Sequence, residues 1–134
     1  MPKPMPFLWF DKNAEEAAKF YVSVFPNSRI TSVSPMTVSF VLDGQEFAAL
    51  NGGPAHANFN ESISFVVTCR NQKEIDGYWE KLTRGGGESR CGWLKDRYGL
   101  SWQVVPEGIG EMLKSATAQQ ALLGMTKIEI DKLK

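Results

Sequence analysis

The chain has 134 residues, of which 43% are hydrophobic and 22% charged, and its 15 basic and 15 acidic residues give a formal net charge of zero. This length and composition predict one folded unit with a real core and exclude an intrinsically disordered chain. A chain without net charge has no overall field to attract nucleic acid or anionic lipid, so we expect no nucleic-acid partner.

The sequence carries no signal for export or for a membrane. The opening residues MPKPMPFLWF contain no apolar stretch long enough for a secretory signal, and no later run is long enough to span a bilayer. Cys69 and Cys91 lack CxxC spacing, which predicts reduced thiols rather than a zinc knuckle or a disulfide. We therefore expect a cytoplasmic protein with no membrane partner.

Residues 5–51 are predicted to form a first module with the order β-α-β-β-β. An apolar strand precedes Asp11 and Asn13, whose side chains suit the start of a helix. The helix has an apolar face at spacings of three and four residues, formed by Ala14, Ala17, Ala18, Tyr21 and Phe25. Pro26 ends it, and a short strand RITSV and a hairpin turning at Asp43-Gly44 follow.

Residues 62–106 repeat the β-α-β-β-β order after a Gly- and Asn-rich linker at residues 51–62. The strand SISFVVTC leads to Asn71, which can cap a helix whose apolar stripe is Ile75, Tyr78, Trp79 and Leu82. Further strands lie in ESRCGWLKD and YGLSWQVV, around a turn that begins at Asp96. The tail, residues 107–134, is predicted to hold two or three short helices, with Thr126 as one N-cap.

The repeated module indicates the fold class. Each module has too few helices to cover both faces of its sheet, so the two sheets must bury their faces by pairing or closing. The sequence therefore predicts an α+β protein with outer helices.

Three segments, FLWFDKNAEEAAKFYVSVFPNSRI, LNGGPAHANFNESISF and CGWLKDRYGLSWQVVP, resemble the PhnB-like branch of the vicinal oxygen chelate superfamily, which includes glyoxalase I, bleomycin-resistance proteins and extradiol dioxygenases. The resemblance implies one domain over residues 1–134, in which two βαβββ modules form a cupped mixed sheet around a pocket. It also implies a homodimer. Proteins of this branch are often labelled 3-demethylubiquinone-9 3-methyltransferases, but the chain has no GxGxG-like loop, so we do not expect methyltransferase activity.

Metal-dependent members of the superfamily take ligands from the first and last strands of each module. The corresponding positions here are Pro6 or Phe7, Ala49, Ser64 and Gln103. Only Gln103 has a usable donor, and one amide oxygen does not hold a transition metal. We therefore predict a site without metal or other cofactor, and note Glu46 and Glu61 as the acids that an error in register would bring in.

The predicted ligand-binding residues are Trp9, Asn51, Trp93 and Gln103. The resemblance places the strands of Trp9 and Trp93 facing the cup, where an indole can line a slot for a flat molecule, although buried Trp also fills cores. Strand alternation puts Gln103 on the face of Ser101 and Val105, where it orients a ligand or bonds a neighbouring backbone group. Asn51 either shapes the pocket mouth or ends its strand.

Other reactive side chains have simpler interpretations. His56, the only histidine, lies in the linker without an acid spaced to orient it, which favours an exposed loop residue over a general base. Cys91 has basic neighbours but no base partner, which favours a small buried apolar residue over a nucleophile. Lys95, Asp96 and Arg97 are explained as a solvated turn.

Three hypotheses about function follow. The first is a protein that binds or sequesters a small aromatic or amphipathic molecule in a metal-free pocket. The second is a lyase, isomerase or dioxygenase that uses a metal or acid–base groups. The third is a scaffold whose pocket is filled by its own aromatic side chains.

Overall fold

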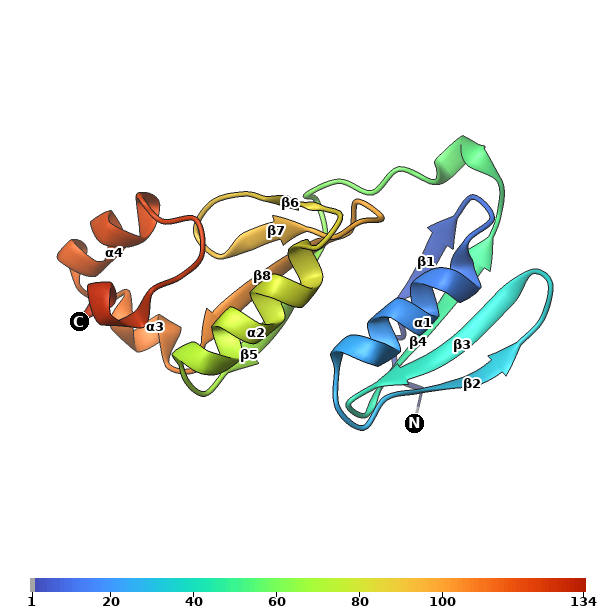
Figure 1. Ribbon diagram of the computed structural model, residues 1–134, viewed down its shortest axis with the longest axis horizontal. Coiled ribbons are helices and arrows are strands. Elements are labelled where there is room, and N and C mark those ends of the chain that lie inside the picture. Colours follow the sequence, from blue (N-terminus) through green and yellow to red (C-terminus); the bar gives the residue numbers. More distant parts are fainter. Residues whose placement is uncertain (1) are drawn as a thin grey trace. The chain divides into compact units, whose positions relative to one another are not determined.

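The computed structural model describes residues 2–134 and contains two compact units, one ending at Asn58 and the other beginning at Phe59. Each unit holds one β-α-β-β-β run and one four-stranded mixed sheet (Figure 1). The α+β class and the repeated module are therefore confirmed.

The first unit consists of β1 (Phe7–Phe10), α1 (Ala14–Val24), β2 (Arg29–Val33), β3 (Thr37–Leu42), β4 (Gln45–Asn51) and the 3-10 turn η1 (Pro54–His56). Its sheet has the order β1-β4-β3-β2, with β1 parallel to β4 and the other pairs antiparallel. The hairpin turn lies where the sequence predicted it, because Asp43 and Gly44 both adopt positive φ angles, 46° and 88°. The chain therefore reverses within two residues.

Helix α1 packs its predicted apolar face on this sheet. Tyr21 is 1% exposed, and its ring stacks on Phe40 with 6.2 Å between centroids; Phe40 in turn stacks on Phe47 at 5.3 Å. Phe25 was expected on the helix but follows its last residue, because the proline after it favours extended backbone.

The second unit consists of β5 (Ser64–Cys69), α2 (Gln72–Thr83), β6 (Gly87–Glu88), β7 (Trp93–Lys95), β8 (Ser101–Pro106), α3 (Ile109–Met112), α4 (Ala116–Leu123) and the 3-10 turn η2 (Ile130–Leu133). The sheet order is β5-β8-β7-β6, which repeats the order of the first unit. Asn71 caps α2 as predicted, since its Oδ1 accepts from the Glu74 N–H at 2.9 Å. The buried residues of α2 are Ile75, Trp79 and Leu82.

The segment ESRCGWLKD, in which the sequence predicted strand structure, contains the end of β6 and all of β7, separated by a turn at Cys91 and Gly92. Cys91 and Gly92 both have positive φ, 59° and 86°, and their N–H groups donate to the carbonyls of Met125 and Thr126 at 2.9 and 2.8 Å. A Cβ on Gly92 would lie 2.8 Å from Ile128 Cδ1. Glycine is therefore required where the tail docks.

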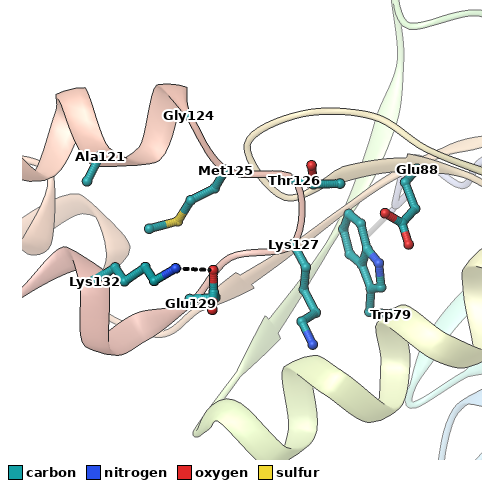
Figure 2. A pocket seen from close by; sticks show the side chains of 9 residues that line it. All are labelled: Trp79, Glu88, Ala121, Gly124, Met125, Thr126, Lys127, Glu129 and Lys132. Carbon is teal, nitrogen blue, oxygen red and sulfur yellow. Dashed lines mark hydrogen bonds and ion pairs between the residues drawn. The ribbon is translucent and has the colours of Figure 1, made fainter.

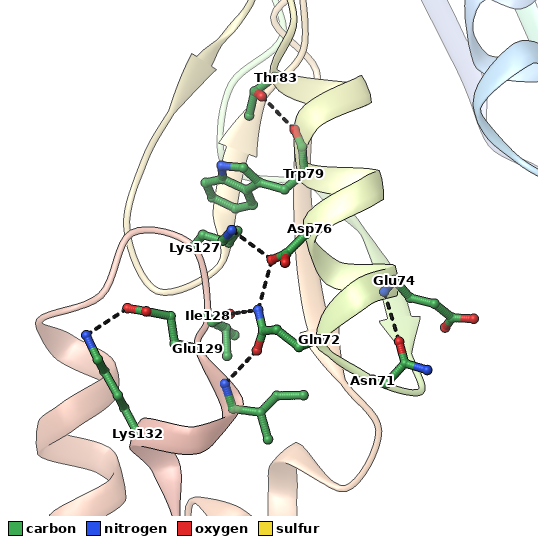
Figure 3. Close-up of polar contacts among 11 residues, drawn as sticks. Asn71, Gln72, Glu74, Asp76, Trp79, Thr83, Lys127, Ile128, Glu129 and Lys132 are labelled. Carbon is green, nitrogen blue, oxygen red and sulfur yellow. Dashed lines mark hydrogen bonds and ion pairs between the residues drawn. The ribbon is translucent and has the colours of Figure 1, made fainter.

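The tail segment is held to α2 by side chains (Figure 3). The Gln72 amide donates to the carbonyl of Ile128 at 2.9 Å and accepts from the N–H of Ile130 at 2.8 Å, and Lys127 pairs with Asp76 at 2.7 Å. The prediction of Thr126 as an N-cap is wrong, because the backbone before η2 is extended and engaged in these contacts.

The turn after β7 is not the solvated turn that the sequence suggested. Asp96 is 2% exposed, and its Oδ1 accepts from the N–H groups of Tyr98 and Leu100 at 2.8 and 3.2 Å. Its Oδ2 accepts from the Trp102 indole at 2.9 Å. Asp96 therefore joins the turn to the core of β8.

The Gln72 contacts generate a prediction. Gln72→Ala removes both hydrogen bonds to the tail, so we expect unfolding to be easier by about 1–2 kcal/mol and amide exchange at Ile130 to rise by about tenfold. Hydrogen exchange and urea unfolding measure both quantities. Lys73→Ala, the exposed neighbour, is the matched control; unchanged exchange at Ile130 in Gln72→Ala contradicts the assigned contact.

Candidate functional site

The face of the first sheet opposite α1 carries Trp9. We call this face the α1-distal face; its residues are Phe7, Trp9, Ser39, Glu46, Ala48 and Leu50, by strand alternation and register. Trp9 is half-buried, its Nε1 donates to the Gly53 carbonyl at 2.9 Å, and the His56 ring lies edge-on at 5.1 Å. A Cβ on Gly52 would lie 2.4 Å from the indole. The linker thus clamps Trp9 in one orientation.

Asn51 lies at the end of β4 and its side chain serves the backbone. Its Oδ1 accepts from the Ala14 N–H at 2.9 Å, and its Nδ2 donates to the Pro35 carbonyl at 3.2 Å. Asn13 is the N-cap residue of α1 but makes no side-chain cap bond. The sequence predicted that Asp11 and Asn13 would cap the start of α1. The cap is instead supplied by Asn51, which lies 37 positions after Ala14.

The face of the second sheet opposite α2 carries Trp93 and Gln103. We call it the α2-distal face; its residues are Ser64, Val66, Trp93, Lys95, Ser101 and Gln103. Trp93 lies directly opposite Gln103 in the β7–β8 ladder, and Gln103 Nε2 donates to Ser64 Oγ at 2.9 Å. Two of the four predicted ligand-binding residues, Trp93 and Gln103, therefore lie together in this unit.

Two further groups of this face are polar. Ser101 is fully buried, and its Oγ is the one buried side-chain polar atom within residues 2–134 that lacks a hydrogen-bond partner. Lys95 pairs with Glu61 at 3.3 Å. The Glu61 backbone N–H and then Lys95 lower the pKa of the Glu61 carboxyl, so it stays ionised at neutral pH.

The donors do not fit the metal site of the superfamily. The expected ligand position Ala49 was assigned to the wrong face, because it pairs with Val38 and is 0% exposed, on the side of α1. The α1-distal face offers one carboxylate, that of Glu46, and the α2-distal face offers the amide of Gln103 and the carboxylate of Glu61, which is paired with Lys95. No group of three or more His, Cys, Asp or Glu side chains suited to a metal occurs within residues 2–134.

The remaining reactive groups show no catalytic arrangement. Cys69 is 0% exposed, and burial raises the pKa of its thiol to about 11, which disfavours the thiolate. Cys91 is half-buried, and its backbone binds the tail. His56 is exposed, as expected, and contacts Trp9.

The comparisons with known proteins decide the family. The family model for 3-demethylubiquinone-9 3-methyltransferase matches residues 2–105. The chain belongs to this family. It is PhnB-like, as the sequence resemblance predicted. No curated protein matches it.

Solved structures agree with this family. A Bacillus cereus PhnB protein, described as a 3-demethylubiquinone-9 3-methyltransferase, is 33% identical over 78% of this chain and 99% of its own, with a TM-score of 0.73. Protein PA1353 of Pseudomonas aeruginosa is 20% identical over 80% and 98% of the two chains, with a TM-score of 0.68. The Listeria monocytogenes fosfomycin resistance protein FosX, complexed with Mn(II) and sulfate, is 14% identical over 84% and 95%, with a TM-score of 0.63. The last two show the shared fold.

Two features of this PhnB-like chain had no clear signal in the sequence. The burial of Asp96 depends on the indole of Trp102, six residues later, which donates to its carboxylate. The sequence shows both residues, but only the folded turn brings them together. The cavity between α2 and the tail involves Trp79, which helical spacing assigned only to the core. Within residues 2–134 no helix is long and apolar enough to cross a membrane.

Asn51 provides a prediction that separates a structural from a ligand-binding role. Asn51→Ala leaves the Ala14 N–H without its cap, so we expect a loss of about 1 kcal/mol in the free energy of unfolding, measured in urea. Asn13→Ala is the control and should lose much less, because its side chain makes no cap bond. Equal losses in the two variants contradict this assignment.

Proposed function

We propose that this PhnB-like protein binds a small aromatic or amphipathic molecule without a metal ion, and that Trp93 and Gln103 contact it. The carrying observation is the cross-strand pairing of a half-buried indole with an amide on the α2-distal face. Side chains directly opposite in an antiparallel pair lie about 5 Å apart at Cβ, so a flat molecule on the indole is within reach of the amide.

The amide has a defined orientation. Its nitrogen donates to Ser64, and this is its one side-chain hydrogen bond within residues 2–134, so Oε1 is available to accept from a ligand. The buried hydroxyl of Ser101, on the same face, adds a donor without a partner. A polar group of the ligand can donate to Oε1 of Gln103 while its apolar part covers Trp93.

Trp9 is proposed to contact a molecule of the same class at a site of its own, on the α1-distal face of the first unit. Its indole nitrogen is already bonded to Gly53, so Trp9 offers an apolar surface rather than a donor. We assign Asn51 an indirect role in ligand binding, because both the oxygen and the nitrogen of its amide are already hydrogen-bonded. These bonds fix the start of the linker, whose following residues contact Trp9.

The second hypothesis, a metal-dependent or acid–base enzyme, has weaker support. A lyase, isomerase or dioxygenase of the superfamily type needs several metal donors on these faces, and they offer Glu46, Gln103 and Glu61. The homodimer also belongs to the proposal, and it rests on the family resemblance and on sheets that are covered on one face. The cytoplasmic location is likewise proposed, as the sequence analysis expected.

A fluorescent probe tests the binding site. We expect 8-anilinonaphthalene-1-sulfonate, an amphipathic aromatic anion, to bind saturably with increased emission, and Trp93→Ala to weaken binding by about tenfold because the contact surface is lost. Gln103→Ala should weaken it less. Fluorescence titration measures each affinity.

The control for this titration is Leu123→Ala, which removes another apolar side chain, 64% exposed, from α4. Its affinity for the probe should equal that of the unmodified protein. If all three variants behave alike, the probe binds elsewhere, and the assigned site is wrong.

Metal addition tests the alternative. We expect protein purified without chelator to contain no stoichiometric metal, and Ni²⁺, Co²⁺, Zn²⁺ and Mn²⁺ to leave Tm unchanged, because a ligand stabilises a fold only by binding it. Elemental analysis and thermal unfolding provide the readout. Stoichiometric metal with a raised Tm favours the enzyme.

A further inference from the structure

A cavity of about 610 Å³ lies in the second unit, between α2, β6 and the tail (Figure 2). Its lining residues are Trp79, Glu88, Ala121, Gly124, Met125, Thr126, Lys127, Glu129 and Lys132. The family match ends at residue 105, so the wall provided by the tail lies outside the part that defines the family. The cavity is also separate from the α2-distal face, because Glu88 pairs with Leu94, which is buried on the side of α2.

The floor of this cavity is apolar and rigid. Trp79 is 5% exposed and Met125 is 7% exposed, and Ala121 adds a methyl group from α4. The tail wall is held by the hydrogen bonds of Cys91, Gly92 and Gln72 described above. The cavity therefore offers a preformed surface for an alkyl or aryl group.

Trp79 has a donor without a partner. Within residues 2–134 the Nε1 of Trp79 donates no side-chain hydrogen bond. Among fully buried polar side-chain atoms of these residues, Ser101 Oγ is the one that lacks a partner, so the Nε1 of Trp79 is not fully buried. The Trp79 nitrogen must therefore reach solvent, and the cavity that it lines is the adjacent opening (Figure 2). An acceptor atom of a ligand can satisfy it.

The charges of the lining leave one carboxylate uncompensated. Lys127 is paired with Asp76 at 2.7 Å, and Lys132 with Glu129 at 3.1 Å. Glu88 is exposed, and within the described residues 2–134 no basic side chain pairs with it. Glu88 and Trp79 both line the cavity (Figure 2). A cation placed there meets both a carboxylate and an aromatic ring.

The end of α4 adds to this preference. Ala121 and Gly124, which line the cavity, lie at the C-terminal end of this helix, which is the negative end of the helix dipole. A cation is therefore favoured by two independent elements.

From these groups we infer a second binding site, for amphipathic amino alcohols, in the cavity between α2 and the tail. The ammonium group pairs with Glu88 at the indole, the hydroxyl oxygen accepts from Trp79 Nε1, and the apolar body lies on Met125 and Ala121. This site is independent of the one proposed on the α2-distal face.

A matched series of three small molecules tests the inference on the full chain. The probe 2-amino-1-phenylethanol carries all three features, 2-phenylethylamine lacks the hydroxyl, and 1-phenylethane-1,2-diol lacks the charge. We expect the amino alcohol to bind with a dissociation constant on the order of 1 mM, and each partial analogue to bind about fivefold more weakly.

Nuclear magnetic resonance reports the location. Titration with the amino alcohol should shift the Trp79 indole N–H signal saturably, with the signal assigned from Trp79→Phe, while the Trp93 indole signal stays in place. A saturable shift at Trp93 alone, or none at Trp79, overturns the inference.

Two variants test the contacts. Glu88→Gln should abolish the preference for the amino alcohol over the diol and leave the diol affinity unchanged; Glu80→Gln, an exposed acid on α2, should alter neither. Ala121→Leu fills the cavity, so binding of both molecules should fall about tenfold with Tm retained. A preference that survives Glu88→Gln contradicts the role of Glu88.

Discussion

Each four-stranded sheet of this protein is covered by a single helix of its own module, and that constraint governs the rest of the structure. A helix buries one face of a sheet, so α1 packs Tyr21 on Phe40 and its neighbours, and α2 lies over Leu94 and Trp102. The distal faces keep half-buried indoles and polar groups. They are the natural place for a ligand in a family whose members share this architecture.

The second constraint is the docking of the tail. Two successive residues with positive φ, Cys91 and Gly92, turn their N–H groups to the tail backbone, and Gln72 binds the same segment with both ends of its amide. These contacts explain the CGW segment without any nucleophilic role for Cys91. They also create the cavity beside Trp79, since neither α2 nor the tail encloses it alone.

The two sites differ in chemistry. On the α2-distal face Trp93 and Gln103 combine an apolar surface with neutral hydrogen-bonding groups, whereas the tail cavity adds the carboxylate of Glu88. A neutral or anionic aromatic molecule suits the first site and a cation the second. The two proposals together predict that the chain distinguishes ligands by charge.

The sequence by itself determined the modules, the helix faces, the Asp43-Gly44 turn and the family, because these depend on spacing between near neighbours and on local backbone preferences. Tertiary structure decided the partners of Asn51 and Asp96 and the direction in which Ala49 faces. The cap of α1 comes from Asn51 rather than Asn13, Asp96 is buried under the Trp102 indole, and Ala49 faces α1. Each depends on register between strands or on contacts across a long loop, and a shift of one residue turns a side chain to the opposite face.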